Sequence, residues 1–233
     1  AVRDSSYGKT GIALYDNTAR KTLASWRDEK EATPLASSHA LTKDHLVVTT
    51  LRGELIVLDL NARPNAAPFR FRTPHGKGIG SSPVVADGRV FVFARRGDDE
   101  VLECLDLATG KSAWKEAHPA PYTMNPAATG HGKGPKATPV VSGGRVFTLG
   151  ISGTLSAHDA KSGRLLWRHD FARAFKATSP KFGAAMSPAV DGARVIAHVG
   201  GHDDGRLAAF DAATGEERWA WKDDGPGYAS PLV

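Results

Sequence analysis

The sequence predicts an all-β protein, a β-propeller built from four-stranded antiparallel blades. Two observations support this fold class: one segment recurs three times with the same spacing of Asp, Gly and Trp, and no helical period of apolar residues occurs along the chain. Four-stranded units that repeat along a chain pack radially in a propeller, which leaves only short sheet edges unpaired.

The three strong repeats share one spacing. In each copy the step from Asp to Gly is four residues and the step from Asp to Trp is eight. Each copy also opens with Ser-Pro or Thr-Pro followed by two apolar residues. The repeated positions are Asp106, Gly110 and Trp114, then Asp159, Gly163 and Trp167, then Asp211, Gly215 and Trp219.

Turn residues divide each repeat into four short strands. Asp87-Gly88 and Gly143-Gly144 predict a tight hairpin between the first and second strands. The Asp-x-x-Thr/Ser-Gly segment predicts the turn between the third and fourth strands, because Asp bonds its own backbone and Gly accepts a positive φ. The second strand, as in Val90-Phe91-Val92-Phe93, is apolar on both faces, as expected where sheets pack on sheets.

We expect one propeller domain over residues 1–233. The copy at 37–73 is weaker: it has strands at 45–49 and 54–59 but lacks the Gly and the Trp. The N-terminal piece is expected to supply only third and fourth strands, around Asp16, and the C-terminal piece only a first strand. We therefore expect four to five blades here, as an incomplete part of a ring of about seven or eight. The predicted blades are 8–32 (partial), 37–73, 81–117, 137–171, 186–222 and 228–233 (partial).

Composition narrows the function classes. With 41% hydrophobic and 24% charged residues, the chain is expected to be globular, and its apolar runs are far shorter than the roughly 20 residues of a membrane-spanning helix. The net charge of +5 is not gathered in a basic stripe, so we expect no nucleic-acid partner. The single cysteine, Cys104, excludes an intrachain disulfide and a thiolate zinc site, and it is expected to be buried.

The repeat motif resembles a known family. Asp-Ala-Ala-Thr-Gly-Glu-Glu-Arg-Trp at 211–219, with its two sister motifs, is similar to the tryptophan-docking repeat of pyrroloquinoline-quinone-like (PQQ-like) propellers, over roughly residues 8–233. None of these tryptophans is followed by Asp, unlike those of WD-type repeats. The resemblance implies that Trp114, Trp167 and Trp219 pack between neighbouring blades.

The family includes two functional kinds. Quinoprotein dehydrogenases hold PQQ and calcium in the central channel, with a catalytic Asp and typically a disulfide between adjacent cysteines, whereas BamB-like exported lipoproteins are binding scaffolds without a cofactor. This sequence has no Cys-Cys pair and no evident calcium-binding set of carboxylates and Asn. The resemblance therefore implies a non-catalytic, BamB-like scaffold, periplasmic or secreted by a bacterium, that binds a protein partner or a small polar or anionic ligand on one propeller face.

Two alternatives remain open. One is a PQQ-dependent oxidoreductase, or a degenerate relative, that would require PQQ and calcium. The other is a polysaccharide-binding propeller. No catalytic residue and no metal ligand is assigned from the sequence.

A candidate ligand site lies in the connections between blades. His-Gly-Lys-Gly occurs at 75–78 and again at 131–134, eight residues before Pro83 and Pro139. Such connections open on one face beside the channel, where glycine N–H groups, Lys and His suit an anionic or polyhydroxyl ligand. The alternative is a repeated turn with a solvated Lys. The candidate ligand-binding residues are His75, Lys77, Tyr122, Asn125, His131, Lys133, Lys181 and Tyr228.

Several other polar side chains are expected to be structural. The acidic segments 98–100 and 202–204 are expected to be solvated hairpins, since neither has the ligand spacing of an EF-hand calcium loop. His158 stands where other repeats have Leu58, Leu105 and Phe210, so it is expected to face the core.

Overall fold

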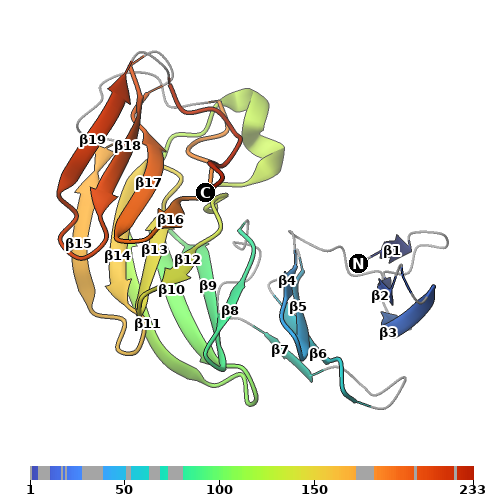
Figure 1. The fold of residues 1–233 in the computed structure, drawn as a ribbon. Helices are drawn as coiled ribbons and strands as arrows, with labels where there is room; N and C mark the ends of the chain where they lie inside the picture. The colour runs from blue at the N-terminus through green and yellow to red at the C-terminus, as the bar shows by residue number, and fades with distance from the viewer. Residues whose placement is uncertain are drawn as a thin grey trace.

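In the computed structural model, the described residues form five antiparallel sheets and one short 3₁₀ helix. Four of these sheets have four strands and the first has three. Figure 1 shows that the sheets follow one another in chain order. The structure describes residues 2–4, 11–16, 18, 20–27, 39–50, 54–62, 69–72, 81–171, 181–201, 204–222 and 225–233.

Each sheet is a meander in which sequential strands are neighbours. The first sheet contains β1 (Val2–Asp4), β2 (Gly11–Asp16) and β3 (Lys21–Arg27). The second contains β4 (Ala40–Leu41), β5 (His45–Thr49), β6 (Glu54–Asp59) and β7 (Phe69–Arg72). The third contains β8 (Val84–Ala86), β9 (Arg89–Arg96), β10 (Asp99–Asp106) and β11 (Ser112–Pro119). The fourth contains β12 (Val140–Ser142), β13 (Arg145–Leu149), β14 (Thr154–Asp159) and β15 (Leu165–Asp170), and the fifth β16 (Ala189–Asp191), β17 (Arg194–Val199), β18 (Arg206–Asp211) and β19 (Glu217–Lys222).

The four-stranded sheets are blades that share an inner side. Their first strands, β4, β8, β12 and β16, contact one another in sequence. Each first strand then pairs with the second strand of its own blade, and the fourth strand lies at the other edge. This radial order confirms the predicted propeller architecture.

Apolar side chains fill the spaces between the blades. Phe147 and Leu149 of the fourth blade share one core cluster with Val195 and Phe210 of the fifth. Phe91 of the third blade packs with Val146 of the fourth in another. The second strands are buried on both faces, as the continuous apolar runs predicted.

The repeated tryptophans connect successive blades. Trp114 Nε1 donates a hydrogen bond of 3.2 Å to the carbonyl oxygen of Ala160 in the next blade, and Trp167 Nε1 donates one of the same length to Ala212. A Cβ added to Gly163 would lie 2.6 Å from the Trp114 ring, so the repeated Gly allows the indole to contact the turn backbone. The docking role implied by the family resemblance is therefore confirmed for these two tryptophans.

Trp219 differs from its two sisters. It occupies the same register position, opposite Ala209, yet 42% of it is exposed, because no described blade covers this face of the fifth sheet. Trp221, two residues further along β19, is 59% exposed.

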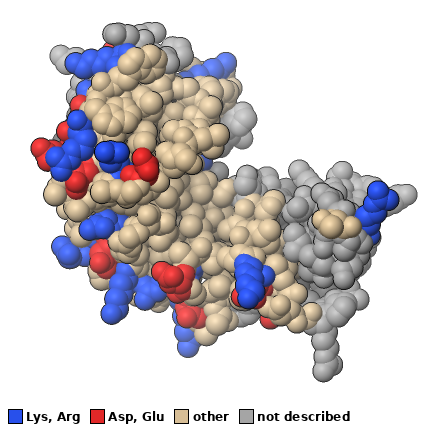
Figure 2. Space-filling model, viewed as in Figure 1, with Lys and Arg blue, Asp and Glu red and all other residues tan. Residues whose placement is uncertain are grey.

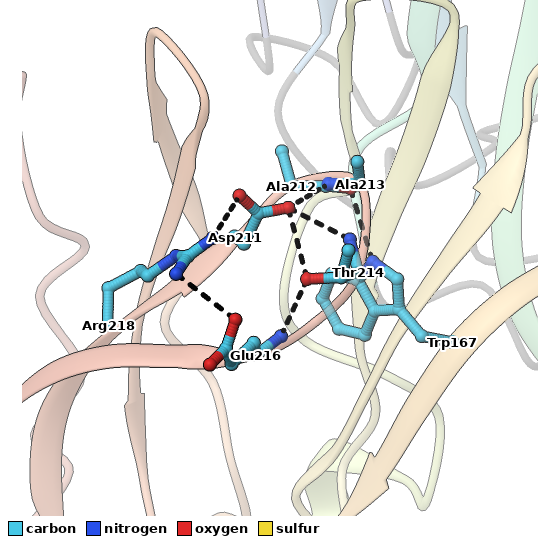
Figure 3. Close-up of polar contacts among 7 residues, drawn as sticks. All are labelled: Trp167, Asp211, Ala212, Ala213, Thr214, Glu216 and Arg218. Atoms are coloured by element: carbon cyan, nitrogen blue, oxygen red, sulfur yellow. Dashed lines mark hydrogen bonds and ion pairs between the residues drawn. The ribbon is translucent and has the colours of Figure 1, made fainter.

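The turns between third and fourth strands follow the predicted chemistry. Figure 3 shows the fifth-blade turn, where Asp211 Oδ1 accepts hydrogen bonds from the backbone N–H groups of Ala213 and Thr214, both at 2.9 Å. The other carboxylate oxygen, Oδ2, accepts a hydrogen bond from Arg218 at 3.0 Å. These bonds stabilise the ionised carboxylate and hold the pKa of Asp211 well below its ordinary value, with the Arg218 bond as the largest cause.

Two details of the sequence prediction need correction. The first sheet has three strands, because β1 pairs with β2 ahead of the expected boundary at residue 8. Residues 2–4 do not carry the Asp, Gly and Trp spacing on which the prediction relied. The connection before the fourth blade also contains a 3₁₀ helix, η2 (Pro126–His131), which begins at a Pro and is too short to produce a helical period.

Candidate functional site

The two ends of the blades are built differently. At one end, the hairpins between first and second strands lie beside the turns between third and fourth strands, as in the Ala160 N–H to Gly144 bond of 2.9 Å. At the opposite end, the hairpins between second and third strands lie beside the connections to the next blade. We call this second end the connection face and define it by residues 97–98, 119–139, 150–153, 181–188 and 225–230. Figure 1 shows η2 and the C-terminal residues at this end of the blades.

Arg95 attaches the long connection of residues 119–139 to the third blade. Its side chain is buried, and Nη2 donates a hydrogen bond of 2.6 Å to the carbonyl oxygen of Ala120. Nη1 reaches the carbonyl oxygen of Lys133 at 3.4 Å, near the other end of the same connection. Nε donates to Gly97 at 3.0 Å. One guanidinium therefore holds both ends of the connection against the β9–β10 hairpin.

Glu100 attaches the fourth blade to the third. Its Oε1 accepts a hydrogen bond of 2.8 Å from the N–H of Ile151, whose carbonyl oxygen in turn accepts one of 2.9 Å from Ala184. The prediction of a solvated acidic hairpin is wrong for this residue, because Asp98 and Asp99 are exposed but Glu100 is fully buried between blades. Strand pairing places it directly opposite Arg95, a cross-strand partner that the run of acidic letters does not reveal.

Burial sets the protonation of Glu100 and its neighbour His118. Burial raises the pKa of Glu100 to about 7, although the Ile151 hydrogen bond and the charge of Arg95 oppose the rise. Burial, followed by the charge of Arg168, lowers the pKa of His118 to about 4. His118 Nε2 lies 3.6 Å from Glu100 Oε2, and neither atom has a hydrogen-bond partner among the described residues. Near neutral pH the Glu100 carboxyl is therefore partly ionised, whereas the His118 imidazole is neutral.

Aromatic side chains from successive connections meet on the connection face. The rings of Phe182 and Tyr228 pack edge to face with centroids 5.5 Å apart, and the Phe182 N–H lies 3.4 Å from the Tyr228 hydroxyl. Lys181 Nζ lies 5.8 Å from the Phe182 ring centroid. The Tyr122 hydroxyl lies 3.1 Å from the position that a Cβ on Gly183 would take. We call Tyr122, Lys181, Phe182 and Tyr228 the aromatic rim.

The structure thus brings together three of the candidate residues, Tyr122, Lys181 and Tyr228. Lys133 lies exposed on the same face. Asn125 has a local role, because its Oδ1 accepts a hydrogen bond of 3.0 Å from Ala127 N–H and caps the start of η2. His75 and Lys77 lie outside the described residues, as does the side chain of His131.

Sequence reasoning missed two positioning residues of this face, Arg95 and Glu100. Both look like surface charges in the sequence, yet each lies at one end of a continuous run of buried residues in an eight-residue strand. The predictions for His158 and Cys104 are confirmed, because both are buried. His158 Nδ1 also lies 3.1 Å from the carbonyl oxygen of Gly163, a contact that satisfies its ring inside the core.

The described residues contain neither a metal-binding cluster of His, Cys, Asp or Glu side chains nor a membrane-spanning helix. Within them, no group of three or more His, Cys, Asp or Glu side chains is placed to hold a metal ion. The described part of the chain also contains no helix with the length and apolar character needed to cross a bilayer.

Relatives with known names cover parts of this chain. Quinohemoprotein alcohol dehydrogenase from Pseudomonas putida is 26% identical over 172 residues, which is 70% of this chain and 22% of that protein. The outer membrane protein assembly factor BamB from Shewanella oneidensis is 34% identical over 84 residues, which is 35% of this chain and 21% of that protein. The chain therefore spans only about a fifth of the length of either relative.

A solved structure resembles nearly the whole chain. BamB from Moraxella catarrhalis superposes with a TM-score of 0.68 at 16% identity, covering 98% of this chain and 65% of that one. At this identity the likeness supports the fold alone. The sequence profile described as outer membrane protein assembly factor BamB matches residues 9–129 and 98–232. Together with the repeated Asp, Gly and Trp positions, this match shows that the chain belongs to the BamB family of PQQ-like β-propellers.

Proposed function

We propose that this propeller is a non-catalytic scaffold that binds a partner protein on its connection face. The observation that carries the proposal is the aromatic rim, in which Tyr228, 51% exposed, packs against Phe182 beneath the Lys181 ammonium group. Tyr and other aromatic residues are enriched at the energetic centres of protein interfaces, since they offer large contact areas at low entropic cost.

The construction of the face supports this role. The connections that carry the rim are held by buried groups, Arg95 and Glu100, so the exposed side chains stand on a rigid base. A preorganised surface loses less entropy when it binds. Lys133 and Lys181 add positive charge, which favours a partner segment with acidic side chains.

Family membership supports a binding role without catalysis. The matching profile carries the name of an assembly factor, and a named BamB relative is 34% identical to part of this chain. We extend this to location and propose that the protein acts in the periplasm or outside a bacterial cell. Figure 2 shows basic and acidic side chains interspersed on the face in view, without the continuous basic stripe that nucleic-acid binding favours.

A site-specific photo-crosslinker tests the proposal. A photoreactive phenylalanine analogue in place of Tyr228 should yield one protein adduct of defined mass in intact cells, and Lys181→Glu in the same chain should reduce its yield several-fold. The same analogue in place of exposed Asp87, at the opposite end of the blades, is the control. An adduct that forms equally from both positions, or that ignores Lys181→Glu, would contradict a specific partner at the rim.

A second candidate is a PQQ-dependent oxidoreductase, favoured by the 26% identity to a quinohemoprotein alcohol dehydrogenase. We assign no described residue to calcium, because no group of three or more His, Cys, Asp or Glu side chains is placed to hold a metal ion among the described residues. The two candidates separate on incubation with PQQ and calcium. Stoichiometric uptake of the quinone, seen by its absorbance on the purified protein and by reduction of an acceptor dye, would favour the oxidoreductase.

A further inference from the structure

The inference begins with an arginine that recurs at the start of the second strand. Arg89 and Arg145 are equivalent, since each lies opposite the turn Asp of its own blade in the strand register, Asp106 or Asp159. Arg89 reaches across to the next blade, where Nη1 donates hydrogen bonds to the carbonyl oxygens of Ala160 at 3.1 Å and Lys161 at 3.0 Å. At this interface the guanidinium bridges the two blades.

Arg145 adopts a different arrangement at the next interface. Its Nη1 turns back to the carbonyl oxygen of Gly143 in its own hairpin, at 3.1 Å. Its Nε is buried and has no hydrogen-bond partner among the described residues. Unlike Arg89, Arg145 therefore makes no hydrogen bond to the next blade among the described residues.

A pocket of about 280 Å³ lies beside this arginine, between the fourth and fifth blades. Its lining includes the apolar side chains of Phe147, Val190, Ala193 and Ala212. Arg145 is the only cationic side chain among its lining residues. The carbonyl oxygens of Ala160 and Lys161 bond the arginine at the preceding interface, whereas here the equivalent residues, Ala212 and Ala213, line open space.

One carboxylate also lines the pocket, but its charge is already satisfied. Asp211 accepts hydrogen bonds from the backbone of its own turn, and its Oδ2 forms an ion pair with Arg218 Nη2 at 3.0 Å, as Figure 3 shows. Arg145 has no ion-pair partner among the described residues. The electrostatic preference of the pocket is therefore set by an uncompensated guanidinium above apolar walls.

We propose that this pocket binds a small monocarboxylate with a compact, branched apolar body. The carboxylate pairs with the Arg145 guanidinium that lines the pocket, and a charge-assisted hydrogen bond is roughly twice as strong as a neutral one. The apolar body fills the space lined by Val190 and Ala193. The site lies at the end of the blades opposite the connection face, so the proposal is independent of the proposed partner-binding role.

A matched pair of ligands tests the charge requirement. The intact chain is titrated with 4-methylpentanoate and with its neutral analogue 4-methylpentanamide, and binding is followed by ¹H–¹⁵N NMR shifts of the 143–145 and 212–213 backbone. We expect millimolar binding of the carboxylate, and binding of the amide weakened by about tenfold or more. Equal affinities, or no shifts with the carboxylate at about 50 mM, would overturn the proposal.

A variant that supplies the carboxylate from the protein itself tests the location. A Cβ on Gly143 would lie 3.6 Å from Arg145 Nη1, so Gly143→Asp places a carboxylate beside the guanidinium. The third blade already has Asp87 at the equivalent position with φ 49°, close to the 55° of Gly143, so the fold accommodates this residue. We expect Gly143→Asp to weaken 4-methylpentanoate binding by about tenfold.

The control exchanges the equivalent residue in the other direction. Asp87→Gly gives the third-blade hairpin the residue of the fourth and should leave the affinity within about twofold. Arg145→Lys, which keeps the charge but removes the planar guanidinium, should weaken binding as Gly143→Asp does. Unchanged affinity in Gly143→Asp and Arg145→Lys would show that the carboxylate binds elsewhere.

Discussion

Glu100 of the third blade accepts a hydrogen bond of 2.8 Å from the backbone N–H of Ile151 in the fourth blade. The two residues are 51 positions apart in the chain, and the bond lies in a buried space between blades. A Cβ on Gly150 would overlap the Glu100 carboxylate, so the backbone of the fourth blade approaches it without a side chain between them. A buried carboxyl thus couples the packing of two blades to its own protonation state.

This coupling predicts a pH effect on stability. The folded-state pKa of Glu100, about 7, lies above its ordinary value of 4.5, so the folded protein keeps a proton that the unfolded chain has released between these values. Its contribution to stability is therefore present at low pH and lost as pH rises through 7. Between pH 5 and pH 8, Glu100→Gln should gain about 2–3 kcal/mol in unfolding free energy relative to the wild type.

Urea unfolding at a series of pH values measures this difference. Asp99→Asn, which changes the exposed neighbouring carboxylate, is the control and should follow the wild-type profile. A pH-independent difference between Glu100→Gln and the wild type would mean that Glu100 does not titrate in this range.

The hydrogen bonds of Arg95 are expected to keep the long connection of residues 119–139 closed to proteases. Arg95→Met keeps an apolar stem of similar length but removes the donors that hold Ala120 and Lys133. Proteolysis within residues 119–137 should accelerate about tenfold, because local opening becomes easier. Arg96→Met, which changes the exposed neighbouring arginine, should cleave at the wild-type rate. Equal cleavage of both variants would remove Arg95 as the anchor.

Replacing a turn glycine by alanine is expected to lower stability most where the glycine contacts a tryptophan of the neighbouring blade. In Gly163→Ala the new methyl group would lie 2.6 Å from the Trp114 ring, whereas in Gly88→Ala it would meet no atom within 4 Å. Both glycines have positive φ, 80° and 70°, so the backbone strain is similar. We expect Gly163→Ala to lose about 2–4 kcal/mol and Gly88→Ala about 1 kcal/mol in chemical denaturation. Similar losses would mean that the turn moves away from the indole at little cost.

Trp167 and Trp219 occupy the same position in their repeats, yet replacing them is expected to change the unfolding free energy by different amounts. Trp167→Phe removes a buried indole and its hydrogen bond to Ala212, and should lower the unfolding free energy by about 2–3 kcal/mol. Trp219→Phe changes a side chain that is 42% exposed and should cost under about 0.5 kcal/mol. Thermal and urea unfolding of the 233-residue chain would compare them, and a Trp219 effect as large as that of Trp167 would indicate that its face is covered in solution.

Much of the fold could be predicted from local sequence. The turn at Asp159 forms because its side chain accepts hydrogen bonds from Ser162 N–H at 2.8 Å and Oγ at 2.7 Å, all within four residues. The buried second strands also followed from their own composition. In the candidate site, the aromatic residues Tyr122 and Tyr228 were found because the connection loops recur. The cap role of Asn125 was missed, although Asn followed by Pro126 is a signal for the start of a helix.

The sequence by itself determined the repeat and the blade meander, because these depend on short-range turn chemistry and on one spacing copied along the chain. The Trp-to-turn docking was expected from the resemblance of the repeat motif to a known family. Only the tertiary structure decided that Glu100 is buried and that Arg145 faces a pocket while Arg89 bridges two blades. The reason is physical: a charged side chain in a short strand has the same local preference wherever it points. Its burial and partners depend on the backbone of the neighbouring blade, about fifty residues away in the chain.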